Sequence, residues 1–139
     1  MHWMLLPFRR YADFSGRSRP MEFWLFGVFV FVAMIALSFV DATVGLGTTT
    51  QYVDRSPFGV SMGVYNQSGL LTLIFWLASL IPGLAVSVRR LHDSDKSGWW
   101  LLIGFVPLIG AIVLFIFMVM GGTHGPNRFG ADPMAKAPR

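Results

Sequence analysis

The sequence contains no cysteine and carries very little charge. Without cysteine, disulfide bonds, thiolate metal sites and thiol nucleophiles are excluded. Charged residues make up 13% of the chain and hydrophobic residues 54%, whereas a soluble domain is about 25% charged. Because so few charges cannot cover an apolar core with a polar surface, we expect lipid to be the main solvent of this chain.

Charge is also absent from three long apolar runs, at about residues 23–40, 69–88 and 99–120. Each run reaches the roughly 18 residues that mark a candidate membrane span. The sequence therefore predicts an all-α integral membrane fold with three transmembrane helices. Because ion-coupled transporters and proton relays place acids or bases at membrane depth, the uncharged runs argue against those functions.

A short interfacial helix is expected before the first span. Within residues 1–16, Met4, Phe8 and Tyr11 fall on one helical face, and Gly16 is suited to end the helix. Such a short helix needs a surface to stabilise it, and the membrane interface would supply one.

Charged residues are expected to end the first two spans. Asp41 should end the first span, and residues 41–68 should form a loop. The middle of this loop, residues 58–65, is mildly apolar and alternating, which suits a segment folded back onto the membrane surface. Arg89 and Arg90 should end the second span.

The third apolar run is open to two interpretations because it contains Pro107 and Gly110. It either crosses the membrane once or turns back at residues 107–110 as a re-entrant hairpin. Its 22 residues are too few for two full crossings, each of which needs roughly 20. The side of the membrane that holds the C-terminus depends on this choice.

The distribution of lysine and arginine predicts the orientation. Four precede the first span, one lies in the long loop, three lie between the second and third spans, and three lie in the C-terminal tail. The positive-inside rule then places the N-terminus and the turn at residues 89–98 in the cytoplasm, with the long loop and the tail outside. Residues 1–133 are expected to form one membrane domain, followed by a disordered tail at residues 134–139.

Three polar segments flank the apolar runs: GRSRPMEFW at residues 16–24, RRLHDSDKSGWW at residues 89–100 and GTHGPNRFGADP at residues 122–133. Together they resemble the bacterial inner-membrane family known as domain of unknown function 805, over about residues 8–133. The resemblance implies a multi-pass protein of the bacterial inner membrane and implies no activity. Pro20 departs from the family pattern, which usually has a small polar residue before the glutamate.

The same segments supply the candidate site residues. We expect a structural or lipid-facing polar cluster and a second motif in the tail. We also expect Glu22 to form an ion pair with Arg89 or Arg90, because the start of the first span and the end of the second lie on the same side of the membrane. The cluster comprises Arg17, Arg19, Glu22, Arg89, Arg90, His92 and Asp93, and the tail motif comprises Asn127, Arg128, Gly130 and Asp132.

His92, Asp93 and Asp95 have side chains suited to metal binding or acid–base chemistry. A catalytic metal site needs three or more converging ligands, but only one short turn supplies them, and His124 is expected on the opposite face. We therefore expect no metal and no cofactor. The favoured interpretation is that Asp93 and Asp95 cap the turn before the third span and that His92 bonds backbone groups.

The leading functional hypothesis is a non-enzymatic inner-membrane protein whose cytoplasmic arginine surface binds anionic lipid or a membrane-protein partner. One alternative is a subunit of an oligomeric pore or transporter, formed by self-association of the chain. Another is a membrane enzyme that acts on a lipid headgroup through His92 and Asp93. Nucleic acid is not an expected partner, because the cations lie beside apolar runs and form no continuous stripe.

Overall fold

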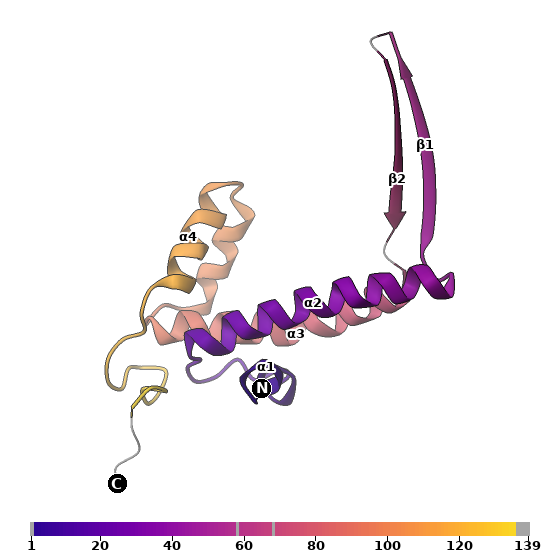
Figure 1. Ribbon diagram of the computed structural model, residues 1–139. Helices are drawn as coiled ribbons and strands as arrows, with labels where there is room; N and C mark the ends of the chain where they lie inside the picture. Colours follow the sequence, from indigo (N-terminus) through magenta and orange to yellow (C-terminus); the bar gives the residue numbers. More distant parts are fainter. Residues whose placement is uncertain (1, 58, 68, 136–139) are drawn as a thin grey trace. The chain divides into compact units, whose positions relative to one another are not determined.

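The computed structural model describes residues 2–57, 59–67 and 69–135 (Figure 1). Two compact units, each described by itself below, comprise residues 1–29 with 79–139, and residues 30–78. In chain order the elements are α1 (His2–Arg9), α2 (Pro20–Val44), β1 (Thr48–Ser56), β2 (Gly59–Gln67), α3 (Leu70–Asp93), the 3₁₀ helix η1 (Gly98–Phe105) and α4 (Ile109–Val119).

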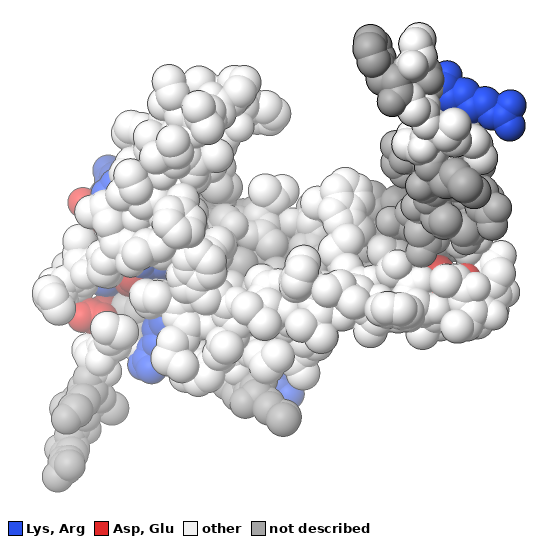
Figure 2. Space-filling model, turned by 45° about the horizontal axis from the view of Figure 1, so that its top comes forward, with Lys and Arg blue, Asp and Glu red and all other residues white. Residues whose placement is uncertain are grey.

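Among the described residues, two helices, α2 and α3, are long and apolar enough to cross a membrane. They contain 25 and 24 residues, which at 1.5 Å per residue gives about 36 Å, more than the roughly 30 Å of a hydrocarbon core. Large apolar side chains such as Phe31 and Phe39 are exposed on α2. Figure 2 shows a face on which the helices carry almost only uncharged side chains. Such a surface suits contact with lipid.

Both helices extend past the charged residues that were expected to end them. Asp41 lies inside α2, and Arg89 and Arg90 lie inside α3. The predicted boundaries are wrong at these points because each of these side chains finds an internal partner. A charge that is paired within the protein does not have to lie outside the helix.

In the unit of residues 30–78, Asp41 caps the first turn of α3. Its carboxylate accepts hydrogen bonds from the backbone amides of Leu71 (3.1 Å) and Thr72 (2.9 Å) and from the Thr72 hydroxyl (2.7 Å). A side chain of one helix thus satisfies amides that the start of another leaves free. Gly69 permits this approach, since a Cβ there would lie 2.3 Å from the Asp41 Cγ.

The segment expected as a loop contains a β-hairpin, so the expected all-α fold is wrong for this part of the chain. Strands β1 and β2 are antiparallel, with Thr48 opposite Gln67 and Ser56 opposite Gly59. The threonines, tyrosine and valine of β1 favour extended backbone. At the turn, Gly59 has a φ of 152°, a conformation that residues with side chains rarely adopt.

The third apolar run forms a helical hairpin, and the prediction of one helix over residues 99–120 is wrong. Helices η1 and α4 lie side by side (Figure 1), and the rings of Trp100 and Phe117 meet edge to face at 5.3 Å. Gly110 allows the close approach, because a Cβ there would lie 1.8 Å from the Ile103 carbonyl oxygen. The 11 residues of α4 span only about 16 Å. A helical hairpin is the backbone course that the re-entrant alternative requires, and its position in a membrane stays a prediction.

Helix α1 confirms a helix near the N-terminus but ends at Arg9, well before Gly16. Phe8 packs on α2, with its ring edge to face against Phe26 at 5.3 Å. After the helix, Asp13 accepts hydrogen bonds from the Ser15 hydroxyl and the Arg10 guanidinium, which hold the pKa of its carboxyl well below the usual range. The location of α1 at the membrane interface stays a prediction.

Candidate functional site

The expected arginine surface is mostly buried. Arg89 and Arg90 are each 0% exposed and Arg17 is 7% exposed, and the carboxylates of Glu22 and Asp93 are buried with them. We call these five residues the arginine cluster. Because their side chains are enclosed by protein, this part of the predicted site is internal and does not face lipid.

Asp93 lies at the centre of the arginine cluster. Its Oδ1 accepts a hydrogen bond from the Arg17 Nε at 2.9 Å, and its Oδ2 accepts one from the Arg90 Nη1 at 2.8 Å. One carboxylate therefore serves two guanidinium groups, one from the segment before α2 and one from α3 itself. Each carboxylate oxygen therefore accepts a hydrogen bond from one of these charges.

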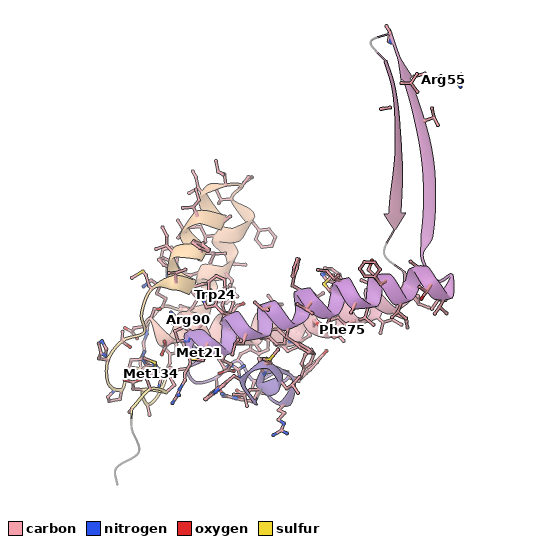
Figure 3. All side chains as sticks on the ribbon, viewed as in Figure 1. Met21, Trp24, Arg55, Phe75, Arg90 and Met134 are labelled. Atoms are coloured by element: carbon pink, nitrogen blue, oxygen red, sulfur yellow. The ribbon has the colours of Figure 1, made fainter. Side chains whose placement is uncertain are left out.

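Arg90 directs its other donors to the end of α4 (Figure 3). Its Nε donates to the Met118 carbonyl oxygen at 3.2 Å, and its Nη2 donates to that of Met120. The last carbonyls of a helix lack partners within the helix and carry partial negative charge, so a guanidinium stabilises them. This contact draws the end of α4 back to the end of α3.

Arg17 holds the tail in the same way. Its guanidinium donates to the carbonyl oxygens of Thr123 and Gly125, both at 2.6 Å. The Thr123 amide in turn donates to the Asp93 carbonyl oxygen at 2.8 Å. The tail therefore returns to the polar end of α3, and the prediction that it lies on the opposite side is wrong. The hairpin of η1 and α4 is the physical reason, since it reverses the chain.

The ion pair expected for Glu22 is present with Arg89. The Arg89 Nη2 lies 3.2 Å from the Glu22 Oε1. Arg90, the other candidate, uses its guanidinium on Asp93 and on the end of α4. The Nε and Nη1 of Arg89 have no hydrogen-bond partner among the described residues, so Glu22 is the main compensation for this buried charge.

Arg19 lies outside the arginine cluster and joins the two ends of the chain. Its Nε donates to the Pro133 carbonyl oxygen at 2.6 Å, and its guanidinium lies over the Trp3 ring at 5.0 Å. The side chain is half-buried. It is therefore closer to the surface than the buried arginines.

His92 bonds backbone, as the favoured interpretation expected. Its Nδ1 lies 3.1 Å from the Gly16 carbonyl oxygen, and because that oxygen only accepts, the ring nitrogen donates. The imidazole stacks on Phe129 with ring centroids 3.8 Å apart. Asn127 of the tail donates to the His92 carbonyl oxygen at 2.9 Å. The tail, including the segment around His124, is thus on the same side as His92, contrary to expectation.

The tail motif closes on itself. Asn127 and Gly130 exchange two backbone hydrogen bonds of 3.0 Å. Asp132 accepts from the backbone amides of Met134 and Gly125, and these bonds lower the pKa of its carboxyl. Arg128 is exposed and pairs with Asp95 at 3.1 Å. Residues 136–139 of the predicted disordered tail lie outside the described residues.

Asp93 and Asp95 were expected to cap the turn before the third span, but their side chains bond arginines instead. Ser97 is the residue before η1, and its hydroxyl accepts the Trp99 amide. Asp93 is held by two arginines and Asp95 pairs with Arg128. Within residues 2–57, 59–67 and 69–135, no group of three or more metal-binding side chains lies close enough together to hold a metal ion.

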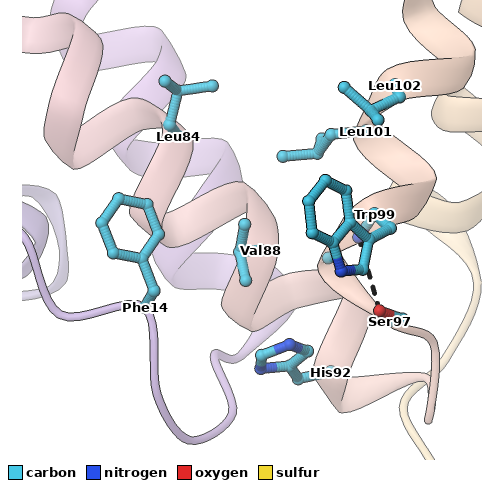
Figure 4. A pocket seen from close by; sticks show the side chains of 9 residues that line it. Phe14, Leu84, Val88, His92, Ser97, Trp99, Leu101 and Leu102 are labelled. Atoms are coloured by element: carbon cyan, nitrogen blue, oxygen red, sulfur yellow. Dashed lines mark hydrogen bonds between the residues drawn. The ribbon is translucent and has the colours of Figure 1, made fainter.

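Beside His92 lies an apolar groove of about 500 Å³ (Figure 4). Leu84 and Val88 of α3 form one wall, and Leu101 and Leu102 of η1 contribute to the other. Sequence analysis missed this groove because it requires η1 to lie beside α3, which a single straight span would not give. The spacing of Leu84, Val88 and His92 on one face of α3 was the available signal.

Comparisons with known proteins give the family. A family model described as "Protein of unknown function (DUF805)" matches residues 11–131. The chain is 35% identical to Inner membrane protein YhaI and 33% identical to Inner membrane protein YhaH of Escherichia coli, over 96% of this chain and 96–97% of each relative. Uncharacterized protein YiiR of the same organism is 26% identical over 86% of this chain and 85% of the relative. No solved structure matches.

These matches cover almost the whole chain and confirm the resemblance found in the sequence. Two of the relatives are named inner membrane proteins, and this chain has apolar helices long enough for that location. The arginine cluster, the tail motif and the hairpin of η1 and α4 all lie within or beside the matched residues. The chain belongs to the DUF805 family and is a bacterial inner-membrane protein.

Proposed function

We propose that the protein is a non-enzymatic, multi-pass inner-membrane protein that binds anionic lipid headgroups on the cytoplasmic side. One observation carries the proposal: every described lysine and arginine except Arg55 belongs to the unit that contains the arginine cluster. By the positive-inside rule, the part of the protein that carries these cations lies on the cytoplasmic side. The return of the tail strengthens the bias, because Arg128 joins the N-terminal cations.

The headgroup-binding cations differ from those expected. Arg17, Arg89 and Arg90 are buried and serve internal partners. Among the described residues of this unit, Arg9, Arg19 and Lys96 have no acidic partner and are at least partly exposed. A cation near an anionic membrane surface contributes about 1 kcal/mol to binding. These three side chains are therefore the ones that supply the attraction for anionic lipid.

The geometry does not favour the enzyme alternative. A catalytic carboxylate must reach substrate, but both oxygens of Asp93 accept hydrogen bonds from guanidinium groups. His92 donates its Nδ1 to backbone and has no described carboxylate bonded to the ring. His92 and Asp93, the residues named in that alternative, therefore have structural roles.

Lipid selectivity tests the proposal. We expect the combined variant Arg9→Gln, Arg19→Gln and Lys96→Gln to lose preference for phosphatidylglycerol over phosphatidylcholine by roughly a hundredfold, since each of the three cations contributes about 1 kcal/mol and about 1.4 kcal/mol is a factor of ten. Native mass spectrometry of the purified protein with both lipids measures the ratio. Arg55→Gln is the matched control and should keep the wild-type ratio. An unchanged ratio in the combined variant would refute the proposal.

Orientation is tested by labelling, because the chain has no cysteine of its own. We expect Arg55→Cys to react with an impermeant maleimide added outside intact spheroplasts. Met134→Cys, which is exposed, should react only after the membrane is permeabilised. Labelling of both positions from outside would contradict the hairpin and the proposed side of the tail.

A further inference from the structure

The groove beside His92 lies between α3 and η1. The two helices are in contact at one end of the groove and are apart along the rest of it. At the start of η1, Gly98 lies against Val88, where a Cβ would be 2.9 Å from the Val88 Cγ1. Further along, Leu84 of α3 and Leu102 of η1 are 48% and 53% exposed and line the same space. The two helices therefore touch at the base of the groove and leave its length open.

Polarity changes along the groove. His92 and Ser97 lie at one end, and Leu84 and Leu102 lie at the other, with the Trp99 indole between them (Figure 4). The polar end adjoins the α3–η1 turn, in which the half-buried Lys96 directly precedes Ser97. A bilayer leaflet has the same order, from charged headgroup to hydrocarbon. The groove therefore has the polarity of a site for an amphiphile oriented like the surrounding lipid.

The volume of the groove and its surroundings indicate which kind of molecule binds there. About 500 Å³ falls within the roughly 300–1,000 Å³ of small-molecule sites. Because this end of α3 belongs to a membrane-spanning helix, the medium that reaches its exposed leucines is lipid. We propose that the groove binds one acyl chain of a membrane phospholipid, with the phosphate at the end formed by His92 and Ser97. There the Ser97 hydroxyl donates a hydrogen bond and Lys96 supplies positive charge.

The proposal goes beyond the headgroup binding inferred above, because it depends on apolar side chains and applies to lipids of any headgroup charge. A phosphatidylcholine probe therefore separates the two. If the exposed cations do not select anionic lipid, the groove still binds the zwitterionic probe. If the groove is empty, charge selection by Arg9 and Arg19, which do not line it, is unaffected.

Photo-crosslinking of the full chain in nanodiscs tests the site. The probe is phosphatidylcholine with a diazirine at the end of one acyl chain, and peptide mass spectrometry locates the adducts. We expect adducts at Leu84, Leu101 and Leu102 to exceed those at Ile112 of α4 by about tenfold, the ratio given by about 1.4 kcal/mol of extra affinity. Equal labelling of all lipid-exposed positions would overturn the proposal, because it would describe ordinary surrounding lipid.

A groove-filling variant makes the test specific. Leu84→Trp should reduce the adducts at Leu101 and Leu102 to the level found at Ile112. Ile116→Trp is the matched control, since Ile116 on α4 has the same 48% exposure, and it should leave the groove adducts unchanged. If Leu84→Trp proves unstable, Leu102→Phe fills the same space from the other wall and should have the same effect.

Two outcomes would contradict lipid binding in the groove. Unchanged groove adducts in a folded Leu84→Trp or Leu102→Phe variant would show that the chain does not enter the groove. A dimer in native mass spectrometry that disappears in the same variants would place a second copy there. Either result overturns lipid binding at this site.

Discussion

Neutralising Asp93 should be the most destabilising single change in the polar part of the protein. Asp93→Asn keeps the shape of the side chain but removes the charge that faces Arg17 and Arg90, whose side chains are 1% and 0% exposed. Two unit charges about 4 Å apart attract by about 4 kcal/mol at an effective dielectric constant of 20. The cost of removing all three groups from water offsets part of this attraction.

Removing one partner of a buried ion pair costs roughly 3–5 kcal/mol, and here one carboxylate serves two arginines. We therefore expect Asp93→Asn to lower the free energy of unfolding by about 3–5 kcal/mol. Titration of the micelle-solubilised protein with sodium dodecyl sulfate, followed by circular dichroism, measures the change. In an Arg17→Met background the same substitution should cost clearly less, because one of the two buried charges is already gone.

Asp95→Asn is the matched control for this experiment. Asp95 lies two residues further along and also pairs with an arginine, but its side chain and that of Arg128 are 47% and 61% exposed. Exposed ion pairs contribute little, so the control should unfold like the wild type. Equal effects of Asp93→Asn and Asp95→Asn would refute the argument that burial makes the arginine cluster important.

Three further predictions follow from individual contacts. Glu22→Gln and Arg89→Gln should each destabilise the protein, and the double variant should cost clearly less than the sum in the same unfolding assay, whereas strict additivity would contradict the pair. Asp41→Ala should cost about 1–2 kcal/mol in that assay, because the α3 cap is lost; no change would mean that water replaces the carboxylate. The lowered pKa of Asp132 means that its carboxylate holds the tail above the unfolded pKa of about 3.9 and releases it as pH falls through the lower folded value. Carbon NMR of the Asp132 carboxyl should show this depressed titration, and an ordinary titration midpoint would contradict it.

The two long helices could be predicted from the sequence, but their ends could not. Uncharged runs of this length have few alternatives to a membrane helix. The predicted helix ends were wrong because charged residues were expected to lie in water, outside the helices. Arg89 instead pairs with Glu22, 67 residues away. Asp41 bonds to Thr72, 31 residues away. Partners this distant in the sequence leave no local signal.

The third apolar run shows a different limit. A run of uncharged residues has the same hydropathy whether it crosses the bilayer or turns back within it. Pro107 and Gly110 allowed the turn, and the sequence left both alternatives open. The deciding contacts are the close approach of Gly110 to Ile103 and the binding of the α4 end by Arg90. For the β-hairpin, alternation was visible in the sequence, but strand pairing was not considered.

The carbonyl oxygens that Arg17 and Arg90 bind belong to residues 118–125, late in the sequence, and this has a consequence for biosynthesis. Arg17 precedes its acceptor Gly125 by 108 residues, so it is synthesised long before that partner exists. Until residues 118–125 are made, Arg17 and Arg90 can pair with Asp93 but lack the carbonyl oxygens that take up their remaining donors. The segment around Arg17 can therefore adopt its final packing only after residues 123–125 have been made. A chain truncated before residue 118 would expose these arginines, which would distinguish it from a finished protein during quality control.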